Sequence, residues 1–386
     1  GAMAYELLTG DRPFARPNAA AEIRALTDEP HVPVDRRRDG LPVGLPAVID
    51  RCLAKRPEKR YANGVELAAA LEALQAREGQ PSGGGVAAGP RSQPQEIRYC
   101  STADGVSIAY AVIGQGPPLV RVLGWFTHLE MEWQWPEMRA FWERLAETRT
   151  VVRYDGRGIG LSEPWSGDFT EDTRRLDLDA VCDAAGAETA AFFGISEGGW
   201  TAARYAVDRP DRVSHLILYG AYCRGASARP GYDAEEDAAL ITLMRKGWGQ
   251  DTPRFRRLFT DDFFPDGADL RIIAHFDSMQ RTSADGETAA RYLASCHVRG
   301  DGRAFFRTIR VPTLVLHSRD DRMVDFAEAR LLASTIPDAE LLPLPSGTHY
   351  FPSDQYSLEP LADAIGRHLR KGTAAVRGGS SPPKET

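Results

Sequence analysis

A serine between two glycines is the residue of this chain best suited to nucleophilic chemistry. Residues 194–198 read Gly-Ile-Ser-Glu-Gly, after an apolar run at 189–193 and before a helical pattern at 199–206. A G-x-S-x-G sequence between a strand and a helix is typical of a sharp turn that exposes the serine hydroxyl at a sheet edge. Glycine suits the flanking positions, because so tight a turn leaves no room for a side chain. We therefore expect Ser196 to be a nucleophile.

A base and an acid are needed beside this serine. A serine hydroxyl attacks a carbonyl only when a base removes its proton, and a carboxylate orients that base. His349 follows the last apolar run, and an imidazole exchanges protons near neutral pH. Asp321 follows the apolar run 312–317, and its neighbour Asp320 is the alternative acid. The order Ser196, Asp321, His349 is one of three unrelated chain orders in which this triad occurs.

The intermediate of such a reaction carries a negatively charged oxygen, which backbone N–H groups stabilise. One expected donor is the amide of Glu197, directly after the nucleophile. The other is the amide of Trp125, in the loop after strand 118–123. Four further residues are candidate walls of the pocket: Phe126, His128, Tyr222 and Tyr350. His128 as a plain loop residue and Tyr350 as a packing residue are the alternatives.

Short apolar runs that alternate with helical patterns predict the elements that position these residues. Strands are expected at 96–101, 106–113, 118–123, 150–154, 189–193, 213–219, 312–317 and 339–344. Helices are expected at 136–148, 173–185, 199–206, 326–336 and 358–371. Two leading strands and then alternation predict an α/β fold with a doubly wound, mostly parallel eight-stranded sheet. His317 lies in a predicted strand, where packing in the core is its expected role.

The chain divides into segments of different composition. We expect a small helical segment at 1–76, a flexible Gly/Pro/Ser-rich linker at 77–95 and a disordered tail at 373–386. The α/β core comprises 96–220 and 303–372. Between them, residues 221–302 form an insertion much longer than a typical crossover, with helical patterns at 233–247, 253–264 and 287–296. This insertion is predicted to be a helical cap over the sheet's carboxyl edge.

Composition excludes several classes of protein. The formal net charge of -7 gives no reason to expect nucleic acid or an anionic membrane as partner. No apolar run approaches the roughly 18 residues of a membrane span, and no signal peptide is visible. The five cysteines include no C-x-x-C pair, which favours a reducing cytoplasm without disulfides or a zinc cluster.

Residues 96–372 resemble the α/β-hydrolase fold superfamily. Residues 152–162 read V-R-Y-D-G-R-G-I-G-L-S, similar to the superfamily's D-x-R-G-x-G-x-S loop. Residues 321–324 are similar to its acid loop, which favours Asp321 over Asp320. Segments 194–199, 215–222 and 246–250 resemble a subgroup often fused to bacterial signalling modules. Many relatives have histidine before the glycine of the oxyanion loop, where this chain has Leu123.

The first segment resembles another family. Residues 5–14 and 45–61 look like the late part of a serine/threonine protein kinase C-lobe. The Gly-rich loop, the phosphate-binding lysine, H-R-D and D-F-G are absent from the sequence, so an active kinase is excluded.

Together these features predict a carboxylesterase-like serine hydrolase that acts through an acyl-enzyme on a small to medium ester, without a metal or organic cofactor. Three alternatives remain open: a ligand-sensing domain of a signalling protein with little turnover, a carbon–carbon bond hydrolase, or a perhydrolase. The sequence does not indicate the natural ester or the oligomeric state.

Overall fold

The chain forms two compact units, Gly1–Ser92 and Gln93–Thr386, in a computed structural model. The structure describes residues 1–16, 24–25, 27–38, 41–78, 95–250, 253–265, 267–350 and 358–371. Most of the predicted linker, residues 79–94, and the predicted tail, 373–386, lie outside the described residues.

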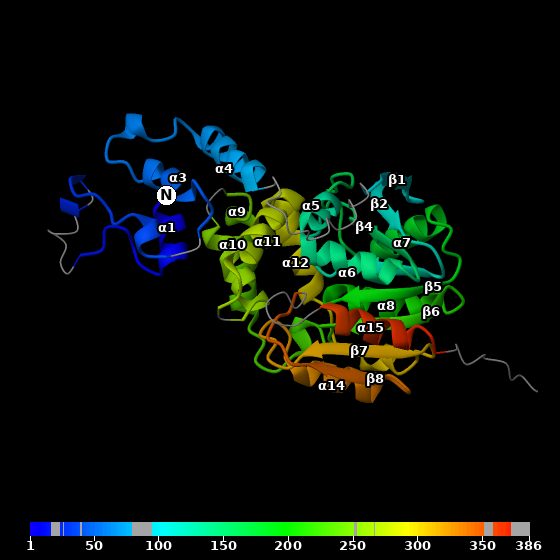
Figure 1. Cartoon of the computed structure of the whole chain (residues 1–386). Coiled ribbons are helices and arrows are strands. Elements are labelled where there is room, and N and C mark those ends of the chain that lie inside the picture. The colour runs from blue at the N-terminus through cyan, green and yellow to red at the C-terminus, as the bar shows by residue number, and fades with distance from the viewer. Residues whose placement is uncertain are drawn as a thin grey trace, which may run out of the picture. The chain divides into compact units, whose positions relative to one another are not determined.

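The first unit consists of short helices around a small apolar cluster. Its elements are α1 (Ala2–Thr9), η1 (Val34–Arg36), α3 (Leu45–Cys52), η2 (Pro57–Lys59) and α4 (Gly64–Glu78) (Figure 1). The buried members of the cluster are Tyr5, Val34, Ile49 and Leu53. Pro46 in the first turn of α3 is well placed, because its missing N–H would have no partner within the helix there.

The second unit is built on an eight-stranded sheet of order β1-β2-β4-β3-β5-β6-β7-β8 (Figure 1). The strands are β1 (Ile97–Ser101), β2 (Ser107–Ile113), β3 (Pro118–Val122), β4 (Thr150–Tyr154), β5 (Ala190–Ile195), β6 (Val213–Tyr219), β7 (Thr313–Ser318) and β8 (Glu340–Leu344). The pairs β1–β2 and β2–β4 are antiparallel, and every later pair is parallel. The predicted mostly parallel α/β sheet is therefore confirmed.

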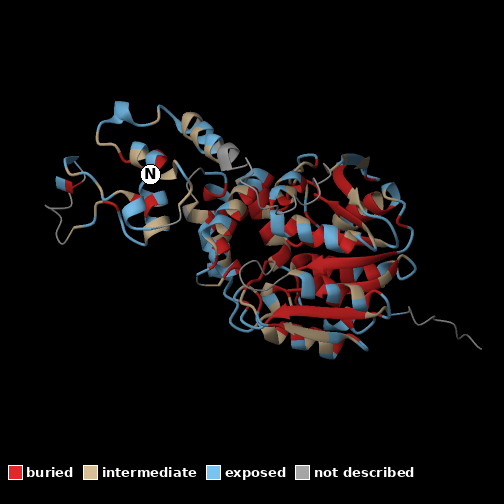
Figure 2. Cartoon of the chain, viewed as in Figure 1, coloured by how far each residue is buried: buried red, intermediate tan, exposed pale blue. Residues whose placement is uncertain are grey.

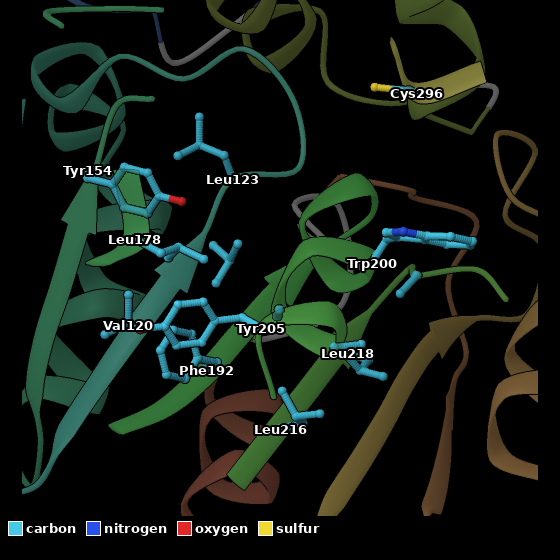
Figure 3. Close-up of a cluster of buried hydrophobic side chains, with 14 of the residues drawn as sticks. Val120, Leu123, Tyr154, Leu178, Phe192, Trp200, Tyr205, Leu216, Leu218 and Cys296 are labelled. Carbon is cyan, nitrogen blue, oxygen red and sulfur yellow. The ribbon is translucent and has the colours of Figure 1, made fainter. Parts of the chain in front are cut away.

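Helices cover both faces of the sheet. One face packs against α7 (Glu171–Ala184), α8 (Glu197–Asp208) and α14 (Phe326–Thr335), and its core includes Val120, Phe192 and Leu216 (Figure 3). The other face packs against α6 (Pro136–Ala146) and α15 (Leu358–His368). Since both faces are covered, the central strand β5 is buried along its whole length, and Figure 2 shows the central strands as buried.

The segment between β6 and β7, residues 220–312, is mostly helical, and from here on we call this whole segment the insertion. It contains η3 (Ala226–Ala228), α9 (Ala234–Gly247), α10 (Arg254–Thr260), η4 (Asp261–Phe263), α11 (Leu270–Ser283), α12 (Gly286–His297) and α13 (Arg303–Phe306). The sequence analysis did not predict α11, nor α5 (Leu129–Gln134), the short helix after the predicted oxyanion loop. No helix in the described part of the chain combines the length and the apolar character needed to cross a membrane.

Candidate active site

Ser196 lies in a strained turn between β5 and α8. Its backbone has φ 50° and ψ -117°, a conformation that costs energy in a non-glycine residue and clusters at functional sites. The glycines on either side permit the turn. A Cβ at position 194 would lie 2.6 Å from the carbonyl oxygen of Gly198, and one at 198 would lie 2.3 Å from that of Leu123. The turn leaves the Ser196 side chain partly accessible while its neighbours are buried.

The structure brings His349 and Asp321 to this serine. The Nε2 atom of His349 lies 2.9 Å from Ser196 Oγ, and its Nδ1 atom lies 2.7 Å from Asp321 Oδ2. With Nδ1–H donating to the carboxylate, Nε2 faces the hydroxyl as an acceptor. The three side chains thus form a continuous chain of hydrogen bonds from hydroxyl to carboxylate.

The carboxylate of Asp321 is held from its other oxygen. Oδ1 accepts hydrogen bonds from the backbone amides of Met323 and Val324, both at 2.9 Å. Burial acts to raise the pKa of Asp321, but His349 and the other donors outweigh burial, so the pKa is lowered. Asp320, the alternative acid, is exposed. The geometry therefore joins Asp321 to the imidazole as an ionised group.

A second imidazole faces the same carboxylate. His317, at the end of β7, is fully buried, and its Nε2 lies 3.4 Å from Asp321 Oδ2 and 2.8 Å from the carbonyl oxygen of Val324. Because a carbonyl only accepts, Nε2 of His317 carries a proton. Burial lowers the pKa of His317, against the opposing effect of Asp321. His317 thus ties together both ends of the turn that presents Asp321.

One predicted oxyanion donor, Glu197, directly follows the serine, and the other, Trp125, follows β3. Gly124 lies close to the turn at residues 194–198, which we call the elbow. A Cβ at position 124 would be 1.9 Å from the carbonyl oxygen of Ile195, so the loop of Trp125 lies against the end of β5. Glu197 is the first residue of α8, where a backbone N–H has no acceptor within the helix. The helix dipole also favours negative charge at this end.

The side chain of Glu197 is buried in an ion-pair cluster. Its Oε1 lies 2.5 Å from Nη1 of Arg299 and 3.5 Å from Nη2 of Arg174, and the hydroxyl of Tyr222 donates to Oε2. Burial acts to raise the pKa of Glu197, but the two arginines outweigh it and the pKa is lowered. Arg299 comes from the insertion and Arg174 from α7, so the residue after the serine is tied to both.

The four candidate wall residues have different surroundings. Phe126 is buried among aromatic rings, with Trp248 at 4.9 Å and Tyr292 at 5.3 Å between ring centroids. Tyr222 belongs to the Glu197 cluster. His128 is buried at the start of α5, where its carbonyl oxygen accepts from the amide of Glu132. Tyr350 follows His349, and its ring stacks on Trp135 with centroids 5.9 Å apart.

A second buried glutamate, Glu132, contacts Tyr350, the residue after His349. Glu132 Oε1 accepts from Arg121 Nη2 at 2.6 Å and from the hydroxyl of Tyr350 at 3.1 Å, and Arg153 Nη1 lies 3.7 Å from Oε2. Burial lowers the pKa of Arg153 to about 10, against the opposing effect of Glu132. The sequence analysis did not single out this cluster. The available signal was that Arg121 and Arg153 are each the fourth residue of an otherwise mostly apolar strand, which indicates a buried acidic partner.

Comparisons with known proteins identify the fold and a set of relatives. Residues 117–295 match the family model of the alpha/beta hydrolase fold. The chain is 29% identical to AB hydrolase superfamily protein YisY of Bacillus subtilis over 256 residues, 65% of this chain and 91% of the relative. It is 30% identical to 2-hydroxy-6-oxononadienedioate/2-hydroxy-6-oxononatrienedioate hydrolase of Pseudomonas sp over 196 residues, 50% of this chain and 67% of the relative. The esterase EaEST from Exiguobacterium antarcticum shares the fold, with a TM-score of 0.62 at 23% identity over 71% of this chain and 99% of the esterase.

Proposed function

The chain belongs to the α/β-hydrolase fold superfamily, and from that premise we propose that it is a serine hydrolase of the carboxylesterase type. Its substrate is a small to medium ester, and the reaction passes through an acyl-enzyme on Ser196. The observation that carries this proposal is the hydrogen-bonded chain from Ser196 Oγ through His349 to Asp321, at 2.9 and 2.7 Å.

In the first half of the proposed reaction, Ser196 Oγ attacks the ester carbonyl as its proton moves to Nε2 of His349. Asp321 holds the Nδ1 proton and stabilises the imidazolium without taking the proton itself. The oxyanion accepts hydrogen bonds from the amides of Trp125 and Glu197. Collapse of the intermediate breaks the ester C–O bond, and His349 returns its proton to the departing alcohol.

In the second half, water replaces the alcohol. His349 takes a proton from the water as the water oxygen attacks the acyl carbonyl, and the same two amides hold the second oxyanion. Collapse then breaks the bond to Ser196 Oγ, which recovers its proton from His349. The products are an alcohol and a carboxylic acid, and no step in this sequence draws on a further co-reactant.

The test is ester turnover by the whole chain and by Ser196→Ala. Wild-type protein is expected to hydrolyse short p-nitrophenyl esters, and Ser196→Ala is expected to lose at least about 10³-fold in kcat. An inactive wild-type protein that binds a ligand equally well with and without the Ser196 hydroxyl would instead support the ligand-sensing alternative.

Carbon–carbon bond hydrolysis is the second candidate function, and the similarity to the 2-hydroxy-6-oxononadienedioate hydrolase of Pseudomonas sp favours it. Both candidates use the same serine, so Ser196→Ala does not separate them. They are separated by comparing kcat/KM for p-nitrophenyl esters with kcat/KM for a 2-hydroxy-6-oxodienoate. A higher value for the latter would replace the esterase proposal with the second candidate.

For the first unit we propose a remnant of a kinase C-lobe that does not transfer phosphate. The support is sequence resemblance at 5–14 and 45–61. The guanidinium of Arg60 donates to the carbonyl oxygens of Ala54 and Lys55, at 2.7 and 3.4 Å, so it is held by backbone groups of the segment after α3. We expect ATP to remain unhydrolysed when it is incubated with the protein, and measurable ATP turnover would contradict this.

A further inference from the structure

The insertion makes a side-chain hydrogen bond to Trp125, the residue proposed as the first oxyanion donor. The indole Nε1 of Trp125 donates to Oε1 of Gln280 at 2.7 Å. Gln280 lies on α11 and is fully buried. Because an indole N–H only donates, the oxygen of the Gln280 amide must face it. The amide nitrogen of Gln280 then donates to Thr260 Oγ1 at 3.0 Å, which fixes the orientation of the whole side chain.

A separate part of the insertion holds Glu197, the residue proposed as the second donor. Arg299 follows α12, and its Nη1 lies 2.5 Å from the Glu197 carboxylate and 3.3 Å from the Glu197 carbonyl oxygen. The guanidinium of Arg299 therefore contacts both the side chain and the backbone of Glu197. Nη2 of Arg299 also donates to Thr201 Oγ1 at 3.3 Å, one turn further along α8. Arg299 thus fixes the first turn of the helix whose amide faces the oxyanion.

The charges at the elbow give Arg299 a second effect. A carboxylate on the residue that donates to an oxyanion opposes the negative charge that develops during the reaction. Arg299 and Arg174 both pair with this carboxylate, and both also pair with Glu171, which is less buried. The pairs offset the charge of Glu197. Without Arg299, a buried and only partly compensated anion would remain beside the reaction centre.

We propose that Gln280 and Arg299 are positioning residues of the oxyanion hole, Gln280 acting through Trp125 and Arg299 through Glu197. In this proposal the insertion completes the catalytic site without supplying a reacting group. Arg299 also neutralises Glu197, so that the elbow remains favourable to negative charge. This inference rests on the proposed function, because it assumes that an oxyanion forms at Ser196.

The inference predicts that one substitution lowers kcat and that a second substitution added to it raises kcat again, which simple loss of packing would not give. Arg299→Met should lower kcat for a p-nitrophenyl ester by about 30- to 100-fold with little change in KM, because the lost interaction matters mainly in the transition state. Adding Glu197→Gln to Arg299→Met should restore kcat by about 10-fold, because the uncompensated anion is then gone. Gln280→Met should lower kcat by about 10-fold.

The experiment measures kcat, KM and the inhibition constant of a trifluoromethyl ketone for each variant of the whole chain. Such a ketone forms a tetrahedral oxyanion adduct with the serine, so its affinity should weaken by the same factor as kcat. The matched control is Arg245→Gln, which breaks an exposed ion pair of the insertion with Glu287, 2.7 Å long. Arg245→Gln should leave kcat and the inhibition constant unchanged.

Thermal unfolding of each variant shows whether it is folded at the assay temperature. If Arg299→Met unfolds, Glu197→Gln/Arg299→Met carries the test, since it leaves no buried carboxylate without its partner, and its ketone affinity must still fall below that of wild type. Wild-type kcat and ketone affinity in Gln280→Met and in the Arg299 variants would overturn the inference, as would equal losses in Arg245→Gln. Retained turnover in Ser196→Ala would instead overturn the proposed function, so the two failures are distinguishable.

Discussion

Two buried glutamates of this protein have the same kinds of partner, although the partner residues differ. Glu132 and Glu197 each face two arginines and accept a hydrogen bond from one tyrosine hydroxyl. Each cluster also includes a residue that directly follows a proposed catalytic residue in the sequence. Tyr350, in the Glu132 cluster, directly follows His349, whereas Glu197 directly follows Ser196.

The two clusters differ in the elements that supply the arginines. Those around Glu132 are Arg121 and Arg153, from the neighbouring strands β3 and β4 in the middle of the sheet. Those around Glu197 are Arg174 of α7 and Arg299 of the insertion. The same chemistry therefore serves two purposes. The arginines of the first cluster lie within the central sheet. Those of the second cluster connect α7 and the insertion to the residue after Ser196.

The largest expected effect lies outside both clusters. Asp321→Asn should lower kcat by about 10⁴-fold, because an amide favours the wrong tautomer of His349. Asp321→Asn should change the free energy of unfolding much less than it changes the activation free energy of the reaction. Steady-state kinetics and thermal unfolding measure the two quantities. Asp320→Asn is the matched control, since this side chain is exposed, and a larger loss in the control would contradict the assignment of the acid.

The next effect compares the two glutamates directly. Glu132→Gln should lower the free energy of unfolding by about 3 to 5 kcal/mol, because it leaves Arg121 and Arg153 buried without a carboxylate partner. Glu197→Gln should cost less, because Arg174 and Arg299 both keep Glu171. Urea denaturation of both variants measures the difference. Equal costs would show that Glu171 does not compensate Arg174 and Arg299 when the carboxylate of Glu197 is removed.

The smallest of these effects concerns His317, which supports the acid loop within the core. His317→Phe should lower kcat by about 10-fold, since it removes the N–H that faces Val324 and Asp321. His317→Gln retains an N–H donor and should recover part of the loss. The comparison of kcat for the two variants is the measurement. If both variants had wild-type kcat, His317 would be a packing residue only, as its position in a strand suggests.

The sequence was sufficient to predict the sheet and the three residues that the structure brings together. Strands such as 150–154 and 213–219 were predicted to the residue, because the first is followed by Asp155 and the second by Gly220. Ser196, Asp321 and His349 were found because each follows such a strand. Chain order and the parallel sheet then require them to meet at one edge.

The partners of the two glutamates could not be predicted in the same way. Arg299 is 102 residues from Glu197 along the chain, and the sequence contains 47 lysines and arginines, any of which could supply the charge. Helix α5 was missed because its six residues are too few to show a helical period. Helix α11 was missed although Ile272, Phe276 and Met279 have the spacing of one helix face. Which ion pair forms depends on how helices pack, and helix packing is not encoded in local patterns.

The account depends most directly on Ser196 as a nucleophile activated by its neighbours. Intact-mass analysis of the protein after treatment with a p-nitrophenyl phosphonate ester, followed by peptide mapping, tests this claim in one measurement. We predict a single phosphonyl adduct on Ser196, and a rate of labelling that falls sharply in Asp321→Asn. Folded wild-type protein that stays unlabelled, or that carries the adduct on another residue, would contradict the account.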